Sequence, residues 1–136
     1  MTFHVDSEVG VLKQAILHRP GLELSRLTPQ NVEDLLFDDV MWADRAREEH
    51  DAFAASLRDK GVTVHLFHEL LVTALDQPGA RDFIADELTT ANRFGPALEA
   101  QLDELVLRAP AETLAEVLIG GVLRKDIELD EGASLL

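Results

Sequence analysis

Acidic and histidine side chains are the groups in this chain whose types and spacing could support chemistry. Asp38 and Asp39 are adjacent acids, a combination that occurs in paired-carboxylate sites and in cation sites. Neighbouring residues in a strand or a helix point in different directions, which favours a loop whose Asp side chains accept amide hydrogens. We expect Asp38 and Asp39 to cap a loop, with cation binding as the alternative.

Two other patterns resemble metal sites without a complete ligand set. In an extended segment His65 and His68 face opposite sides, which prevents chelation. The alternating acids that begin at Asp126 resemble a calcium loop, but Glu131 stands where such a loop requires Gly. We therefore expect hydrogen-bonded or solvated side chains, no metal site and no cofactor.

The sequence offers no recognisable nucleophile. It contains no cysteine, and no serine stands in a Gly-x-Ser-x-Gly setting. A general-base role for His18 would need such a partner, so we expect His18 to fix the turn that follows the first strand. Gly120 and Gly121 lack the spacing and the Lys of a phosphate-binding loop and indicate the end of a helix. We predict no catalytic residue in this chain.

Composition restricts the classes of partner. A chain of 136 residues with 46% hydrophobic content is the size of one domain and can form a core. A formal net charge of −14 disfavours nucleic acids and anionic membranes as partners. No apolar run approaches the ~20 residues of a membrane span, and no signal peptide is recognisable. With no disulfide available, we expect a cytoplasmic protein.

The sequence predicts a strand–helix–strand unit that would position the acidic and histidine side chains. Residues 11–17 and 62–67 have the patterns of strands, and residues 40–60 have helical spacing that stops at Gly61. Two strands joined by a helix predict parallel pairing. The apolar stripe expected for this helix consists of Trp42, Ala46, Phe53 and Leu57.

The stretch from Leu27 to Asp39, between the first strand and the long helix, predicts a short helix over the end of the sheet. Thr28 suits the N-cap and Pro29 suits the first helical position. Segments of this kind often carry binding residues. Beyond the second strand we expect only helices, which together form a small bundle: residues 68–75, residues 80–88, one that starts at Gly95-Pro96 and one from Pro110 to Gly120.

Six motifs in this order resemble the amino-terminal region of bacterial arginine deiminases. They are Ser7-Glu8-Val9-Gly10-Val11-Leu12, His18-Arg19-Pro20-Gly21, Leu27-Thr28-Pro29, Leu35-Leu36-Phe37-Asp38-Asp39, Glu49-His50-Asp51-Ala52-Phe53 and Ile119-Gly120-Gly121-Val122. The resemblance implies a hydrolase that converts L-arginine to L-citrulline and ammonia without a cofactor. It also implies a catalytic Cys, His, Glu and Asp, which find no counterpart here. We expect an amino-terminal fragment that is inactive alone.

The resemblance further implies a fold and a division of the chain. Residues 1–75 would be one βαβ module of an incomplete five-bladed α/β propeller, including the loop-helix that covers the pocket. Residues 76–136 would be a helical insertion, truncated at its carboxyl end. L-arginine would bind only in the complete enzyme, and homo-oligomers or self-association are expected because family members are commonly dimers or tetramers.

The resemblance places one binding residue in this chain. The backbone carbonyl of Leu36 would face the α-amino group of the substrate, and Leu35, Phe37, Asp38 and Asp39 would form the rest of the pocket-covering segment. The alternative from the residues alone is that Leu35, Leu36 and Phe37 bury apolar surface. A second alternative concerns the whole chain, which would be a non-catalytic binding module derived from the deiminase amino terminus.

Overall fold

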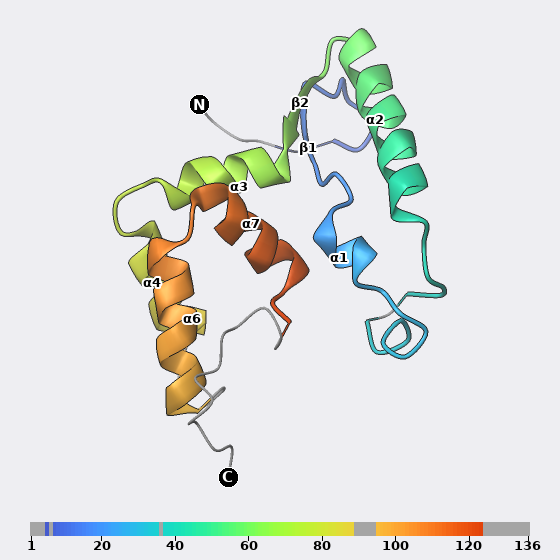
Figure 1. Ribbon diagram of the computed structural model, residues 1–136. Coiled ribbons are helices and arrows are strands. Elements are labelled where there is room, and N and C mark those ends of the chain that lie inside the picture. Colours follow the sequence, from blue (N-terminus) through green and yellow to red (C-terminus); the bar gives the residue numbers. More distant parts are fainter. Residues whose placement is uncertain (1–4, 6, 36, 89–94, 124–136) are drawn as a thin grey trace.

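The computed structural model describes residues 5, 7–35, 37–88 and 95–123. These residues form a mixed α/β fold with a two-stranded parallel sheet and six helices. Figure 1 shows α1 and α2 on one side of the sheet and a group of four helices, α3, α4, α6 and α7, on the other. We refer to these four as the helical group. None of the helices within the described ranges is long and apolar enough to cross a membrane.

The predicted strand–helix–strand unit is confirmed. Strands β1 (Gln14–Leu17) and β2 (Thr63–Leu66) pair in parallel, with Gln14 opposite Thr63 and Leu17 opposite Leu66. Helix α2 (Ala43–Asp59) connects them and ends before Gly61, whose φ of 81° suits glycine. Strand β1 is shorter than predicted because Val11 and Leu12 precede the region that pairs with β2 and remain exposed.

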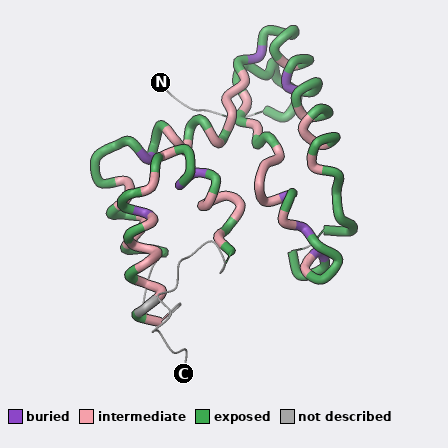
Figure 2. The backbone as a smooth tube through the Cα atoms, viewed as in Figure 1, coloured by how far each residue is buried: buried purple, intermediate pink, exposed green. Residues whose placement is uncertain are grey.

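The apolar stripe predicted for α2 is wrong at its two aromatic positions. Trp42 precedes the helix and is 74% exposed, and Phe53 is 54% exposed. Ala54, which is 2% exposed, is instead the buried residue of the helix. A small side chain at this position lets α2 approach β2 closely, whereas Phe53 lies about a quarter of a turn away on the helix surface. Figure 2 shows exposed positions along the outer side of α2.

The helix predicted from Thr28 does not form. The only helix between the strand and α2 in the described residues is α1 (Leu22–Ser25), and residues 29–35 form successive turns. Asn31 secures them, since its Oδ1 accepts the Thr28 N–H at 2.7 Å and its Nδ2 donates to the Arg26 carbonyl at 3.1 Å. Asn side chains compete with helical hydrogen bonds in this way, which explains why the Thr28-Pro29 pattern predicted a helix that does not form.

The helical group matches the prediction closely. Its helices are α3 (Phe67–Leu75), α4 (Ala80–Leu88), α6 (Pro96–Arg108) and α7 (Ala111–Gly120). Leu75, Val106, Leu114 and Ala115 form its buried core. Arg81 adds polar contacts, because its Nη1 donates to the carbonyls of Val106 at 3.0 Å and Ala109 at 2.7 Å. This guanidinium satisfies carbonyls at the end of α6 that have no helical partner.

A close contact between α1 and α7 joins the helical group to the rest of the chain. A Cβ atom on Gly120 would lie 2.8 Å from the Cβ of Leu22, so only glycine fits there without movement. Arg26 Nη1 donates to the carbonyl of Gly120 at 2.9 Å and also to that of Gly121. We call this contact, made by Leu22, Arg26, Gly120 and Gly121, the α1–α7 joint.

The core of the helical group yields a first prediction. Leu114 is 0% exposed, so Leu114→Ala should lower the free energy of unfolding by about 2–5 kcal/mol, because it removes packed apolar atoms and leaves a cavity. Urea denaturation measures the change. Leu107→Ala, at a position that is 46% exposed on α6, is the matched control and should cost less than about 1 kcal/mol. Equal losses for the two variants would contradict the described core.

The α1–α7 joint yields a second prediction. Gly120→Ala should lower the free energy of unfolding by about 1–3 kcal/mol, because the new methyl group overlaps Leu22 and forces α1 and α7 apart. Gly10→Ala is the matched control, since its new Cβ would meet only the exposed Ser7 side chain at 3.3 Å. If both substitutions leave the urea midpoint unchanged, α1 does not pack on α7 as described.

Candidate functional site

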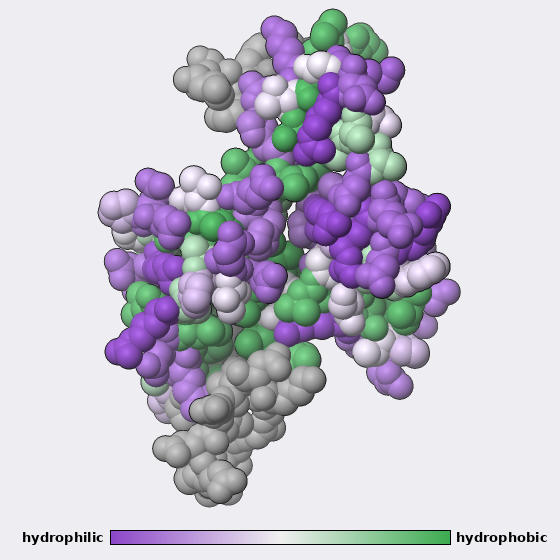
Figure 3. Space-filling model, turned by 45° about the horizontal axis from the view of Figure 1, so that its top comes forward, coloured by the Kyte–Doolittle hydropathy of each residue, from purple (hydrophilic) through white to green (hydrophobic). Residues whose placement is uncertain are grey.

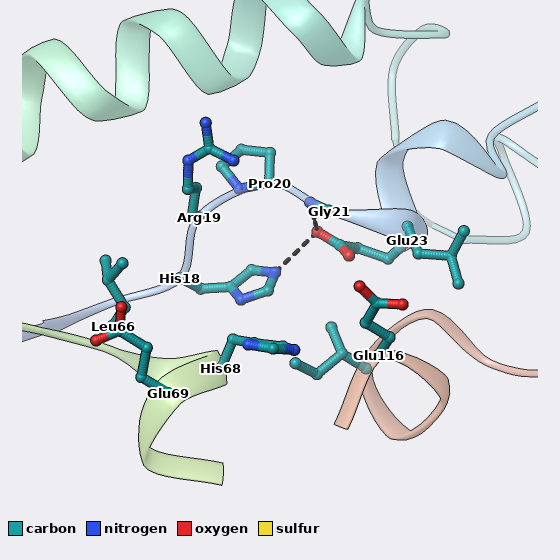
Figure 4. A pocket seen from close by; sticks show the side chains of 11 residues that line it. His18, Arg19, Pro20, Gly21, Glu23, Leu66, His68, Glu69 and Glu116 are labelled. Carbon is teal, nitrogen blue, oxygen red and sulfur yellow. Dashed lines mark hydrogen bonds and ion pairs between the residues drawn. The ribbon is translucent and has the colours of Figure 1, made fainter. Parts of the chain in front are cut away.

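A pocket of about 230 Å³ lies at the carboxyl ends of the two strands. The segment after β1 contributes His18 and Glu23, the start of α3 contributes His68 and Glu69, and α7 contributes Glu116 across from them (Figure 4). Ligands of parallel α/β sheets characteristically bind outside the carboxyl ends of the strands. The pocket therefore occupies the position where this fold class places binding groups.

Two hydrogen bonds fix the position of the Glu23 carboxylate in the pocket. Its Oε1 lies 2.8 Å from His18 Nε2 and accepts the Gly21 N–H at 2.8 Å. Burial raises the pKa of the Glu23 carboxyl, but the hydrogen bonds from Gly21 and His18 outweigh it and bring the pKa below its ordinary value. Glu23 is therefore an anion at neutral pH. The predicted role of His18 in fixing the turn is confirmed by this contact.

His68 faces the same pocket from the first turn of α3. Its Nδ1 lies 3.7 Å from Glu112 Oε2, and Figure 4 shows its ring within the pocket below His18. His65 does not converge with it, because His65 Nε2 lies 3.0 Å from Gln14 Oε1 on the sheet. The two histidines thus have separate partners, although residues 65–68 are not one extended segment as expected, because α3 begins at Phe67.

Sequence reasoning missed Glu23 and Glu116. A signal for Glu23 was present, since an acid two residues after the Pro20-Gly21 turn lies where it can accept that turn's amide hydrogens. Glu116 gave no such signal, because only the docking of α7 near α1 brings it to this pocket.

The described residues of the predicted pocket-covering segment do not line the pocket at the strand ends. Leu36 is outside the described residues, and none of its neighbours lines the pocket at the strand ends. Leu35 and Phe37 are 52% and 37% exposed, so the described part of this segment does not form a buried apolar cluster within the chain. Asp39 caps the loop as expected, with its Oδ1 accepting the Val40 N–H at 2.7 Å.

An ion pair connects the turn after β1 to α2. Arg19 donates from Nε and Nη2 to the two carboxylate oxygens of Asp51, each at 2.8 Å. These hydrogen bonds lower the pKa of Asp51 from its ordinary value of 3.8 to about 2. Both side chains are about half exposed, so solvent and salt weaken the contribution of the pair to stability.

This pair generates a titration prediction. The Asp51 carboxyl should protonate near pH 2, and Arg19→Gln should move its midpoint back towards 3.8. Because the pKa is depressed in the folded state, the pair stabilises the fold above about pH 4 and this stabilisation is lost as the pH falls towards 2. NMR of the carboxyl carbon measures the midpoint. Arg58→Gln, elsewhere on α2, is the control and should leave Asp51 unchanged, whereas an equal shift in both variants would refute the pairing.

Comparison with known proteins confirms the resemblance seen in the sequence. The family model for arginine deiminase matches residues 33–134. The arginine deiminase of Rhodococcus erythropolis strain PR4 is 44% identical over 134 residues, which cover 97% of this chain and 33% of that protein. The arginine deiminase of Mycolicibacterium gilvum strain PYR-GCK is 43% identical over 127 residues, covering 93% of this chain and 32% of that protein.

The chain spans about a third of the length of these curated relatives. Its similarity to them nevertheless extends over nearly all of its own residues and includes the turn after β1, α2 and the end of α7. Because the family model and the relatives match most of this chain, the chain belongs to the arginine deiminase family.

Proposed function

We propose that this chain supplies the amino-terminal part of an arginine deiminase, the hydrolase that converts L-arginine to L-citrulline and ammonia. The observation that carries the proposal is the pattern of coverage. Nearly the whole chain aligns with two arginine deiminases, while only a third of each relative is accounted for. A chain of this kind is a part of the enzyme rather than the whole.

In this proposal the chain contributes structure and one substrate contact, but no reacting group. The sequence contains no cysteine, so the thiolate chemistry expected of the family cannot take place on this chain. The Leu36 carbonyl accepts a hydrogen bond from the α-amino group of L-arginine. The exposure of Leu35 and Phe37 supports this role, because their apolar side chains remain available to cover a pocket completed by other residues.

The strand–helix–strand unit would be one module of an α/β propeller. Within the described residues its sheet has two strands, and Ile16 on β1 is 59% exposed, which leaves apolar surface for a neighbouring module. Trp42 and Met41 before α2 are further exposed apolar side chains. In the complete enzyme these side chains would be covered by the remaining modules.

The second candidate is a non-catalytic binding module that reuses the deiminase amino terminus. The same exposed apolar side chains support it, since they also suit a separate partner or a second copy of the chain. The two candidates predict different results when the chain is mixed with the rest of a deiminase: an enzyme part restores turnover, and a binding module does not. A complementation experiment therefore distinguishes them.

We predict that the purified chain forms no citrulline from L-arginine, and that citrulline appears when the chain is mixed with a polypeptide covering the rest of the Rhodococcus relative. Colorimetric detection of citrulline provides the measurement. The first control is that polypeptide alone. The second is the chain mixed with the same polypeptide after its cysteines are replaced by alanine. Neither should produce citrulline. Turnover by the purified chain alone would overturn the first part of the proposal. Binding without restored turnover would favour the non-catalytic module.

A further inference from the structure

The described residues form two parts that bury different side chains. The described residues from 14 to 66 contain β1, α1, α2 and β2, and we call them the sheet part; the other part is the helical group. The four buried residues of the core cluster all belong to the helical group. Ala54 on α2 and Val62 before β2 are buried in the sheet part. Two parts with separate buried residues can move relative to each other as units when the interface between them is small.

The covalent connection between the parts is a single junction. Strand β2 ends at Leu66 and helix α3 begins at Phe67, so no loop residue separates them. The backbone of Leu66 is extended, with φ −92° and ψ 129°, and its side chain makes no capping hydrogen bond to α3. Hinges in proteins are commonly a few residues at the ends of elements, where a change in backbone angles is absorbed. The Leu66–Phe67 junction has this character.

The second connection is the α1–α7 joint, which Arg26 closes. Its Nη1 donates to the carbonyl of Gly120 at 2.9 Å and also to that of Gly121, and both hydrogen bonds are charge-assisted. The hydrogen bond to Gly121 is exposed and the one to Gly120 is partly buried. Because water reaches this contact, hydrogen bonds to water can replace those to the carbonyls when the joint opens. The contact can therefore break and form again without unfolding either part.

An apolar hollow also crosses the boundary between the parts. Its lining includes His18 from the sheet part and Phe67, Leu71 and Leu118 from the helical group. The His18 ring packs edge-on against Phe67, with the ring centroids 6.1 Å apart. Figure 3 shows hydrophobic surface in the recess between the helical group and the rest of the chain. Keeping this surface away from water favours the arrangement in which the two parts are close together.

The pocket at the strand ends contains groups that act in the opposite direction. Glu23 belongs to the sheet part and Glu116 to the helical group, so two carboxylates of like charge line one pocket from opposite parts (Figure 4). Glu23 Oε2 and His68 Nε2 each have less than 1 Å² of accessible surface and no hydrogen-bond partner among the described residues. Burying polar atoms in this way costs free energy. A wider pocket would separate the carboxylates and bring water to both atoms.

We propose that the helical group rotates as a unit about the Leu66–Phe67 junction and that Arg26 holds it in the closed position. In the closed position the joint is formed and the pocket has a volume of about 230 Å³. When Arg26 releases the two carbonyls, α7 moves away from α1, the pocket widens, and Glu23 and His68 become accessible. This goes beyond the deiminase assignment, because the motion belongs to this chain and requires no substrate.

The test is the measurement of amide residual dipolar couplings by NMR on the 136-residue chain. These couplings report the orientation of each N–H bond in a weakly aligned sample, so one alignment tensor fits two parts whose relative orientation is fixed. We expect one tensor to fit the sheet part and the helical group of the unmodified chain. Arg26→Ala should abolish this common tensor, while the couplings of each part still fit a tensor of their own. The separate fits also show that both parts remain folded.

A second variant opens the joint in a different way. Gly120→Ala places a methyl group against α1 and should also abolish the common tensor, so it decides alone if Arg26→Ala does not fold. Arg45→Ala is the matched control, because this guanidinium is bound by carboxylates of α2 itself, and it should keep the common tensor. A common tensor that persists in Arg26→Ala would overturn the proposal. Separate tensors in the unmodified chain, or loss of the common tensor in Arg45→Ala, would overturn it as well.

Discussion

The contact between α1 and α7 is the interaction on which the described arrangement depends. Without it, the helical group would be attached mainly through the direct passage from β2 into α3. Gly120 permits the approach because it has no side chain, and the Arg26 guanidinium then satisfies carbonyls that the end of α7 leaves without helical partners. The pocket follows from this geometry, since Glu116 and Ile119 on α7 reach the groups after β1 only when the two helices are docked.

Three of the six motifs that resemble arginine deiminases lie at structural junctions of this chain. The His-Arg-Pro-Gly turn is held to α2 by the Arg19–Asp51 pair, and Asp51 belongs to a second shared motif. Gly120 belongs to a third and lies against Leu22. At these three motifs, residues that resemble the family make contacts that fix how elements meet.

The elements that could be predicted from sequence are those whose limits are set locally. Gly61, the Gly95-Pro96 pair and Gly121 mark helix ends or starts through their own backbone preferences, and these boundaries were confirmed. The inward face of α2 could not be predicted in the same way, because Ala54 and Phe53 are both apolar and only the distance to β2 decides between them. Glu116 joins the pocket through packing across the chain. Leu36, the residue assigned to substrate by resemblance, lies outside the described residues.

The hydrogen bond from Arg26 to Gly120 joins residues 94 positions apart, which has a consequence for how the chain folds during synthesis. The entropy lost in closing so long a loop is recovered only when both ends are present, and contacts of large sequence separation slow folding. The strand–helix–strand unit spans residues 14–66 and can assemble first, whereas the core of the helical group also needs α7, which contributes Leu114 and Ala115. On the ribosome, Leu22 and Arg26 cannot make their contacts with Gly120 until the end of α7 has emerged, and during that interval they are open to chaperones and to other nascent chains.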